Sequence, residues 1–242
     1  MTKAEIYEFD LNGIIIYPGI LIAEQVVKMN EILDSQMGDE FPRSFSFIDS
    51  DSCFMDLMAH PGTLQIIRHM IGDWLRLDHA YGLQMTRQTE IGENLHGGPR
   101  TDNGEHQYQW LDGTMYNGLI VVMYALEDVN DGDGGFICVP GSHKANLHFK
   151  PEVSSHLVAN PSLKAGDMLI FTEALVHGTK KWTSQNRRRS LLYKYSPGHS
   201  TWGNPENMTK LLPHAQNDLH RSLLRPPSVG SREAVPFPEV ED

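Results

Sequence analysis

Two histidines and a cluster of arginines are the residues of this sequence best suited to chemistry. His177 lies near the end of the apolar segment AGDMLIFTEALVHGT, and RRRSLLYKY begins at Arg187, ten residues after His177. His96 lies upstream, in LHGGP. Imidazole nitrogens are good ligands for iron, and an arginine guanidinium binds a carboxylate through two parallel hydrogen bonds. Their order therefore indicates a mononuclear iron site that also binds a dicarboxylic acid.

The segments that must position these residues predict a mainly β fold. Strands are expected over residues 13–21, 81–90, 118–129, 136–140, 167–179 and 187–197. Apolar residues at helical spacing predict helices over 22–37 and 61–75, and a helix interrupted at Pro213 over 208–224. Residues 92–117 are rich in Gly, Asn, Asp and Gln and predict a long loop, a feature that is often functional. Short strands separated by Gly and Pro turns favour a jelly roll with the N-terminal helices packed on one face.

Composition limits the classes of partner. Acidic residues outnumber basic ones by 31 to 20, which gives a formal net charge of −11 and disfavours binding to a nucleic acid polymer. The two cysteines, Cys53 and Cys138, form no disulfide framework or metal-cluster spacing. No apolar run is long enough to span a membrane, and the N-terminus lacks a secretory leader pattern. We therefore expect one cytoplasmic domain over residues 1–242, with its core over about 8–230 and an extended C-terminal tail.

Three motifs together resemble the phytanoyl-CoA dioxygenase family. They are GLIVVMYALEDVNDGDGGFICVPGSHK, LKAGDMLIFTEALVHGT and RRRSLLYKYSP. The resemblance implies a double-stranded β-helix, which is a cupin-like jelly roll. It also implies an enzyme that uses Fe(II), with 2-oxoglutarate and O2 as co-substrates.

The resemblance also assigns roles to individual residues. His177 matches the distal metal ligand of the family, and Arg188, eleven positions further on, matches the arginine that binds the far carboxylate of 2-oxoglutarate. Thr179 and Tyr124 are further candidates for contacts with this co-substrate. Strand alternation places Arg188 on one face, with Arg187 and Arg189 on the other. A register shift of one residue would transfer the role to either neighbour.

The first metal-binding histidine departs from the family pattern, which is His-x-Asp. His96 lies at the expected place, but Gly98 stands where the aspartate belongs. His106 is the rival ligand, and the residue two positions beyond it is Tyr108. None of the twelve histidines has Asp or Glu two positions further on. The usual carboxylate ligand is therefore missing whichever histidine binds.

Two reactions follow from this gap, depending on what fills it. If Asp102, Glu105 or Asp112 reaches the iron from the loop, the enzyme is a hydroxylase or dioxygenase. If the position beside His96 and Gly98 stays open, chloride can occupy it, as the resemblance to halogenases of this superfamily implies. Radical chlorination of an unactivated C–H bond is the first prediction. A non-enzymatic relative that binds a small ligand is the third alternative.

The substrate is expected to be a small molecule. Arg100 in the long loop would suit a carboxylate or phosphate group on that molecule. Trp110 lies in the same loop, as a candidate lining residue. Glu173 either faces the substrate or caps a strand edge.

Overall fold

A six-stranded antiparallel sheet forms the centre of the protein. The computed structural model describes residues 1–38, 40–99, 107–230 and 233–238. The strands, in spatial order, are β1 (Ile14–Tyr17), β9 (Met168–Thr172), β7 (Ile120–Ala125), β11 (Arg188–Pro197), β3 (Leu75–Met85) and β2 (Ser44–Phe45). β11 pairs with both β3 and β7, so it lies inside the sheet.

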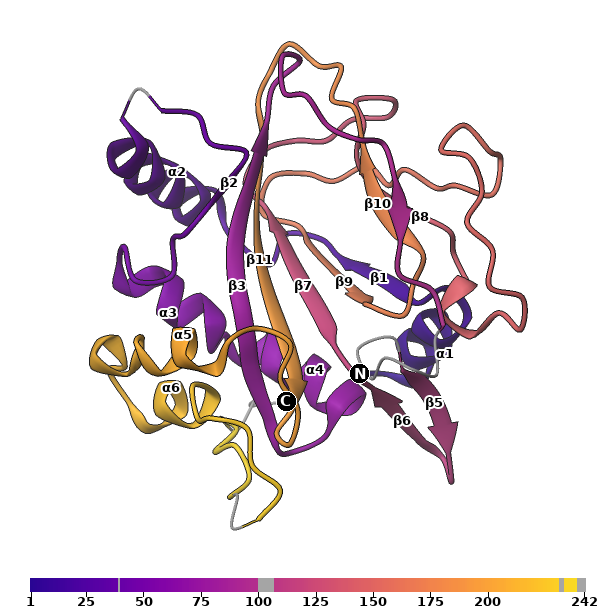
Figure 1. Ribbon diagram of the computed structural model, residues 1–242. Coiled ribbons are helices and arrows are strands. Elements are labelled where there is room, and N and C mark those ends of the chain that lie inside the picture. The colour runs from indigo at the N-terminus through magenta and orange to yellow at the C-terminus, as the bar shows by residue number, and fades with distance from the viewer. Residues whose placement is uncertain (39, 100–106, 231–232, 239–242) are drawn as a thin grey trace.

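A smaller sheet faces the large one and closes the jelly roll (Figure 1). Its strands, in order, are β4 (Leu95–His96), β10 (His177–Lys180) and β8 (Gly135–Cys138). A separate hairpin consists of β5 (Tyr108–Leu111) and β6 (Thr114–Asn117). The predicted jelly-roll fold is confirmed.

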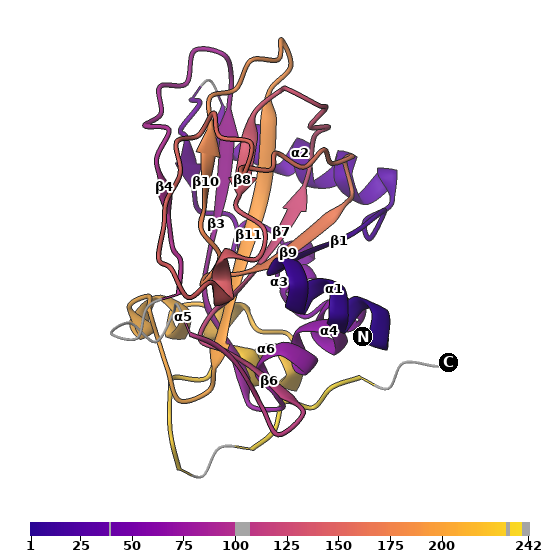
Figure 2. The same ribbon diagram turned by 90° about the vertical axis from the view of Figure 1, so that its right-hand side faces the viewer.

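Helices cover the opposite face of the large sheet (Figure 2). The N-terminal helices are α1 (Lys3–Asn12), α2 (Ala23–Met37), α3 (Ser52–Met58) and α4 (Pro61–Ile71), and the C-terminal segment adds α5 (Pro205–Thr209) and α6 (Asp218–Leu223). Single 3₁₀ turns lie at η2 (Ser142–Lys144) and η3 (Leu212–His214). Thr2 caps α1 in a capping box with Glu5, and α4 has proline in its first turn, where a missing N–H costs nothing. Within the described residues, no helix combines the length and apolar character needed to cross a membrane.

The large sheet separates two apolar cores because its side chains alternate between faces. On β11, Leu191 and Tyr193 point into the core shared with the helices. Leu192 points into the core between the two sheets. Arg188 and Lys194 have the same parity as Leu192, so they face the interior of the jelly roll. This is the face on which a site can form.

The structure corrects three boundaries. The segment 167–179 is not one strand, because a turn divides it into β9 and β10. The expected loop 92–117 contains β4, β5 and β6. β3 begins at Leu75 rather than at Tyr81, because the chain leaves α4 at Ile71, earlier than predicted, and enters the sheet almost at once.

Candidate metal centre

Three side chains with metal-ligating atoms converge between the two sheets: His96, Glu173 and His177. One ligand atom from each lies within 4.8 Å of the others. His96 and His177 are direct cross-strand partners of β4 and β10, and their ring centroids lie 4.2 Å apart. Glu173 Oε1 lies 3.6 Å from His177 Nε2. Two imidazoles and one carboxylate are the ligand set typical of non-heme Fe(II) enzymes.

A tight turn between β9 and β10 brings Glu173 to His177. The Leu175 N–H donates to the Thr172 carbonyl at 2.9 Å, and the Ala174 N–H donates to the Thr172 hydroxyl. In a continuous strand, residues four apart would lie about 13 Å from each other. The turn folds the chain back, so that the carboxylate and the imidazole face each other.

His177 is oriented by the same turn. Its Nδ1 lies 2.7 Å from the Leu175 carbonyl, to which it donates a hydrogen bond. This bond selects the tautomer in which Nε2 carries a lone pair toward Glu173. Burial lowers the pKa of His177 to about 4, so the ring is neutral at neutral pH. A neutral imidazole with a free Nε2 is the form that binds a metal.

Glu173 is a charged carboxylate in a buried place. Burial by itself would raise the pKa of its carboxyl group, but His177 and Lys194 lower the pKa more, to about 2. Lys194 Nζ donates to Glu173 Oε2 at 3.1 Å. The carboxylate is therefore ionised and has one oxygen directed toward His177.

Arg188 lies on the same interior face, completely buried. Among the described residues, two of its nitrogens have only sulfur atoms as hydrogen-bond partners, those of Met85 at 3.7 Å and Met123 at 3.5 Å, and its Nε has no partner. No ion pair to it exists within the described part of the chain. Burial lowers its pKa to about 10, which still leaves it charged at neutral pH. A buried guanidinium without a carboxylate partner fits the far carboxylate of 2-oxoglutarate.

Glycine makes room beside this guanidinium. A Cβ placed on Gly135 would lie 2.8 Å from Arg188 Nε. Thr179, two residues after His177 on β10, is the cross-strand partner of Phe136. The small sheet therefore brings Gly135 and Thr179 to the side of the interior that holds Arg188. These residues could hold 2-oxoglutarate between the metal-binding groups and the arginine.

Arg187 and Arg189 lie on the other face of the sheet. Both bind Asp34 of α2, and Arg189 also contacts Gln84. Tyr124 also lies on the helix side, where its hydroxyl is 2.8 Å from the Thr63 hydroxyl. The structure thus places Arg188, but not Tyr124, at the side of the interior expected to bind the co-substrate.

Gly98 lies two residues after His96, and its backbone conformation favours glycine. Its φ is +97°, and a Cβ there would lie 2.7 Å from His148 Cε1 and 3.0 Å from Val176 Cγ2. Asp112, proposed as a replacement ligand, lies at the tip of the β5–β6 hairpin and outside the cluster of ligating groups. Arg100, Asp102, Glu105 and His106 lie outside the described residues.

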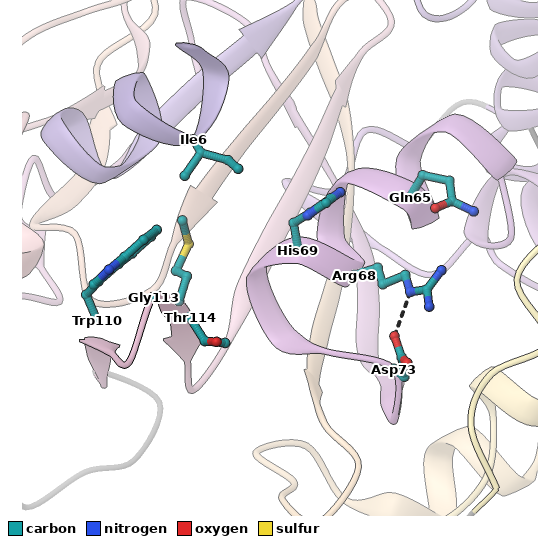
Figure 3. Close-up of a pocket in the computed structure, with 9 residues that line it drawn as sticks. Ile6, Gln65, Arg68, His69, Asp73, Trp110, Gly113 and Thr114 are labelled. Carbon is teal, nitrogen blue, oxygen red and sulfur yellow. Dashed lines mark hydrogen bonds and ion pairs between the residues drawn. The ribbon is translucent and has the colours of Figure 1, made fainter. Parts of the chain in front are cut away.

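Trp110 belongs to a different pocket. This pocket of about 430 Å³ lies between α1, α4 and the β5–β6 hairpin, and Arg68, His69 and Thr114 also line it (Figure 3). None of the three metal-ligating residues borders it. The structure therefore does not bring Trp110 to the candidate metal centre.

The sequence leaves the role of Glu173 open between a substrate contact and a strand cap, and it does not point to Lys194. In the continuous strand that the sequence predicts, Glu173 would lie away from His177. Alternation along β11 is the signal that could have found Lys194, since it has the same parity as Arg188.

Comparisons with known proteins bear on the family and the fold. The family model described as phytanoyl-CoA dioxygenase (PhyH) matches residues 9–190. No match was found among curated proteins. HygX from Streptomyces hygroscopicus, solved with nickel and 2-oxoglutarate, is 24% identical, with a TM-score of 0.74 over 83% of this chain and 89% of that chain.

Two further solved structures share the fold. HygX with nickel, 2-oxoglutarate and hygromycin B is 25% identical, with a TM-score of 0.72 over 83% of this chain and 89% of that chain. SnoN, a non-heme alpha ketoglutarate dependent epimerase from nogalamycin biosynthesis, is 19% identical. Its TM-score is 0.63, over 95% of this chain and 96% of that one. The protein belongs to the phytanoyl-CoA dioxygenase family of Fe(II)- and 2-oxoglutarate-dependent oxygenases.

Proposed function

We propose that this protein oxidises an unactivated C–H bond of a small molecule, most simply by hydroxylation, and that Glu173 supplies the carboxylate ligand of its iron. The observation that carries the proposal is the position of Glu173 Oε1, 3.6 Å from His177 Nε2 in a cluster with His96. This carboxylate comes from the turn before β10 rather than from the position two residues after His96. It would take the place of the family's aspartate, which is absent because position 98 is glycine.

Each group at the centre has a defined task in this proposal. His96, His177 and Glu173 hold Fe(II) on one face and leave the other positions for 2-oxoglutarate and O2. Arg188 pairs with the far carboxylate of 2-oxoglutarate, and Thr179, two residues after His177 on β10, is a further candidate for a contact with this co-substrate. Bound iron would activate O2, which is the oxidant, so that substrate, 2-oxoglutarate and O2 yield hydroxylated product, succinate and CO2. The apolar side chains around Arg188 exclude water from the co-substrate.

Radical chlorination is the second candidate, and the absence of a carboxylate at Gly98 favours it. It requires an open position for chloride at the iron. Two observations weigh against that requirement: Glu173 is near enough to take the position, and the backbone of Gly98 accounts for its lack of a side chain. Hydroxylation is therefore the preferred reaction.

Product mass distinguishes the two reactions. The iron-loaded protein is incubated with 2-oxoglutarate, O2 and a panel of small molecules, with and without chloride. The panel includes hygromycin B, because HygX was solved with it bound, together with small carboxylates and phosphates. We expect succinate and a product heavier by one oxygen, unchanged by chloride. A product with the isotope pattern of chlorine would refute the preferred reaction.

The ligand assignment has its own test in the Glu173→Gln variant. Glutamine keeps the size of the side chain and removes its charge, so Fe(II) affinity and succinate formation should both fall by at least about tenfold. Glu127→Gln is the matched control, because Glu127 is also in an ion pair, with Arg187 on the other face of the sheet. Unchanged Fe(II) affinity in Glu173→Gln would exclude Glu173 as a ligand.

A further inference from the structure

We propose that Lys194 is a positioning residue that holds Glu173 so that only one carboxylate oxygen reaches the metal. The inference rests on the proposed function, in which Glu173 is a ligand. Lys194 Nζ lies 3.1 Å from Glu173 Oε2, while Oε1 is the oxygen that faces His177. The two oxygens of one carboxylate thus have different partners. Both side chains are largely buried, with 11% and 8% of their surface exposed.

The ion pair is not needed to hold the backbone at this point. The Glu173 N–H already donates to the Leu119 carbonyl at 3.0 Å, and the turn that follows is closed by its own hydrogen bond from Leu175 to Thr172. What the backbone leaves undetermined is the direction of a flexible glutamate side chain. Lys194 fixes that direction from β11, which β7 separates from β9 in the large sheet.

Lys194 is itself supported from behind by a series of contacts along β3. Its ammonium lies 5.6 Å from the centre of the Tyr81 ring, and Tyr81 stacks on His79 with centroids 6.0 Å apart. His79 Nδ1 lies 2.6 Å from Asp78 Oδ1, and Asp78 is fully buried. Holding a long lysine side chain in one place costs rotamer entropy, which these contacts offset. These contacts keep the ammonium near Oε2.

The number of coordination positions explains why one oxygen matters. Two imidazoles and a carboxylate bound through one oxygen leave three positions at an octahedral metal, which 2-oxoglutarate and O2 together need. A carboxylate bound through both oxygens would take one of these. By occupying Oε2, Lys194 keeps the open positions available for the co-substrates.

Metal binding tests the inference without any substrate. Co(II) is used as the probe, and its affinity and visible absorption spectrum are measured for wild type and Lys194→Met. Loss of an outer partner of a metal ligand typically weakens metal binding 10- to 100-fold, so we expect at least about a tenfold loss and an altered spectrum. Removing a positive charge would by itself strengthen the binding of a cation. Equal or tighter Co(II) binding with an unchanged spectrum would therefore overturn the positioning role.

Further variants separate this role from general damage to the fold. Lys194→Arg keeps a cationic donor and should retain affinity within about threefold of wild type, a rescue that a purely structural role for the lysine stem does not require. Lys194→Gln serves if the methionine variant does not fold, and a spectrum and affinity equal to wild type would count against the inference. Lys164→Met is the matched control, because Lys164 forms an exposed ion pair with Asp128.

Glu173→Gln distinguishes failure of this inference from failure of the proposed function. If Glu173→Gln binds Co(II) as wild type does, the ligand assignment itself is wrong. If Glu173→Gln loses affinity but Lys194→Met does not, Glu173 remains a ligand and only the role of Lys194 is refuted.

Discussion

Replacing Gly98 with aspartate restores the carboxylate of the usual His-x-Asp pattern, yet we expect it to damage this protein. The backbone at Gly98 has φ of +97°, a conformation that L side chains rarely adopt. A Cβ would also lie 2.7 Å from His148 Cε1 and 3.0 Å from Val176 Cγ2. His148 is exposed and can move aside, whereas Val176 is buried and cannot move easily.

The expected cost follows from these two effects. A sparsely populated backbone conformation costs about 1–3 kcal/mol for a residue other than glycine. Overpacking against a buried side chain adds about 1–3 kcal/mol. Allowing for relaxation of His148, we expect Gly98→Asp to lower the free energy of unfolding by about 2–4 kcal/mol. For a chain of this size, that corresponds to a fall in Tm of about 5–15 °C.

Thermal and urea unfolding measure this loss of stability. Two control variants separate the effects of the carboxylate, the steric contact and the backbone strain. Gly98→Ala has the same backbone strain and contact without a carboxylate, so it should lose a similar free energy. Gly113→Asp has a φ of +75° with nothing within 4 Å of its Cβ, so it should lose only the strain contribution. If Gly98→Asp is as stable as wild type and binds Fe(II) more tightly, the position is a vacant ligand site. The argument against halogenation would then be refuted.

Three further variants test other parts of the structure. Arg188→Met should raise the KM for 2-oxoglutarate by about 10- to 100-fold, measured by succinate formation, because a charge-assisted hydrogen-bonded pair contributes about 1.5–3 kcal/mol. Asp78→Asn should lower the free energy of unfolding by about 3–5 kcal/mol, because it removes the charged partner of buried Arg76. Burial alone would raise the pKa of Asp78, but His79 and the Gly203 and Trp202 N–H groups lower it below its usual range. Its contribution is therefore present above about pH 4 and is lost as the pH falls further. Burial lowers the pKa of His143 to about 4, so wild type should lose up to about 3 kcal/mol as the pH falls from about 6.5 to 4. His143→Gln should show a smaller loss in urea unfolding over the same range, and an equal loss would contradict this origin.

The sequence by itself indicated the fold and the family, and it predicted His177 and Arg188 as site residues. The strands of β7, β8 and β11 were predictable because their apolar runs and Gly-rich turns are local patterns. The family resemblance pointed to Arg188 by its spacing from His177, and strand alternation placed it on the opposite face from Arg187 and Arg189 while leaving the register open. The structure agrees, since Arg188 faces the interior while Arg187 and Arg189 bind Asp34 outside it.

The proposed carboxylate ligand, Glu173, can be recognised only in the tertiary structure. An apolar run such as LIFTEALV predicts one continuous strand, and nothing local indicates that it turns after Thr172. A hydrogen bond from Leu175 to Thr172 closes the turn, and β9 and β10 on either side of it belong to different sheets. That separation brings Glu173 to His177, and pairing of β11 within the large sheet sets Lys194 against it. The absence of the His-x-Asp aspartate is visible in one segment of the sequence. The proposed replacement, Glu173, depends on where β4, β10 and β11 lie relative to one another.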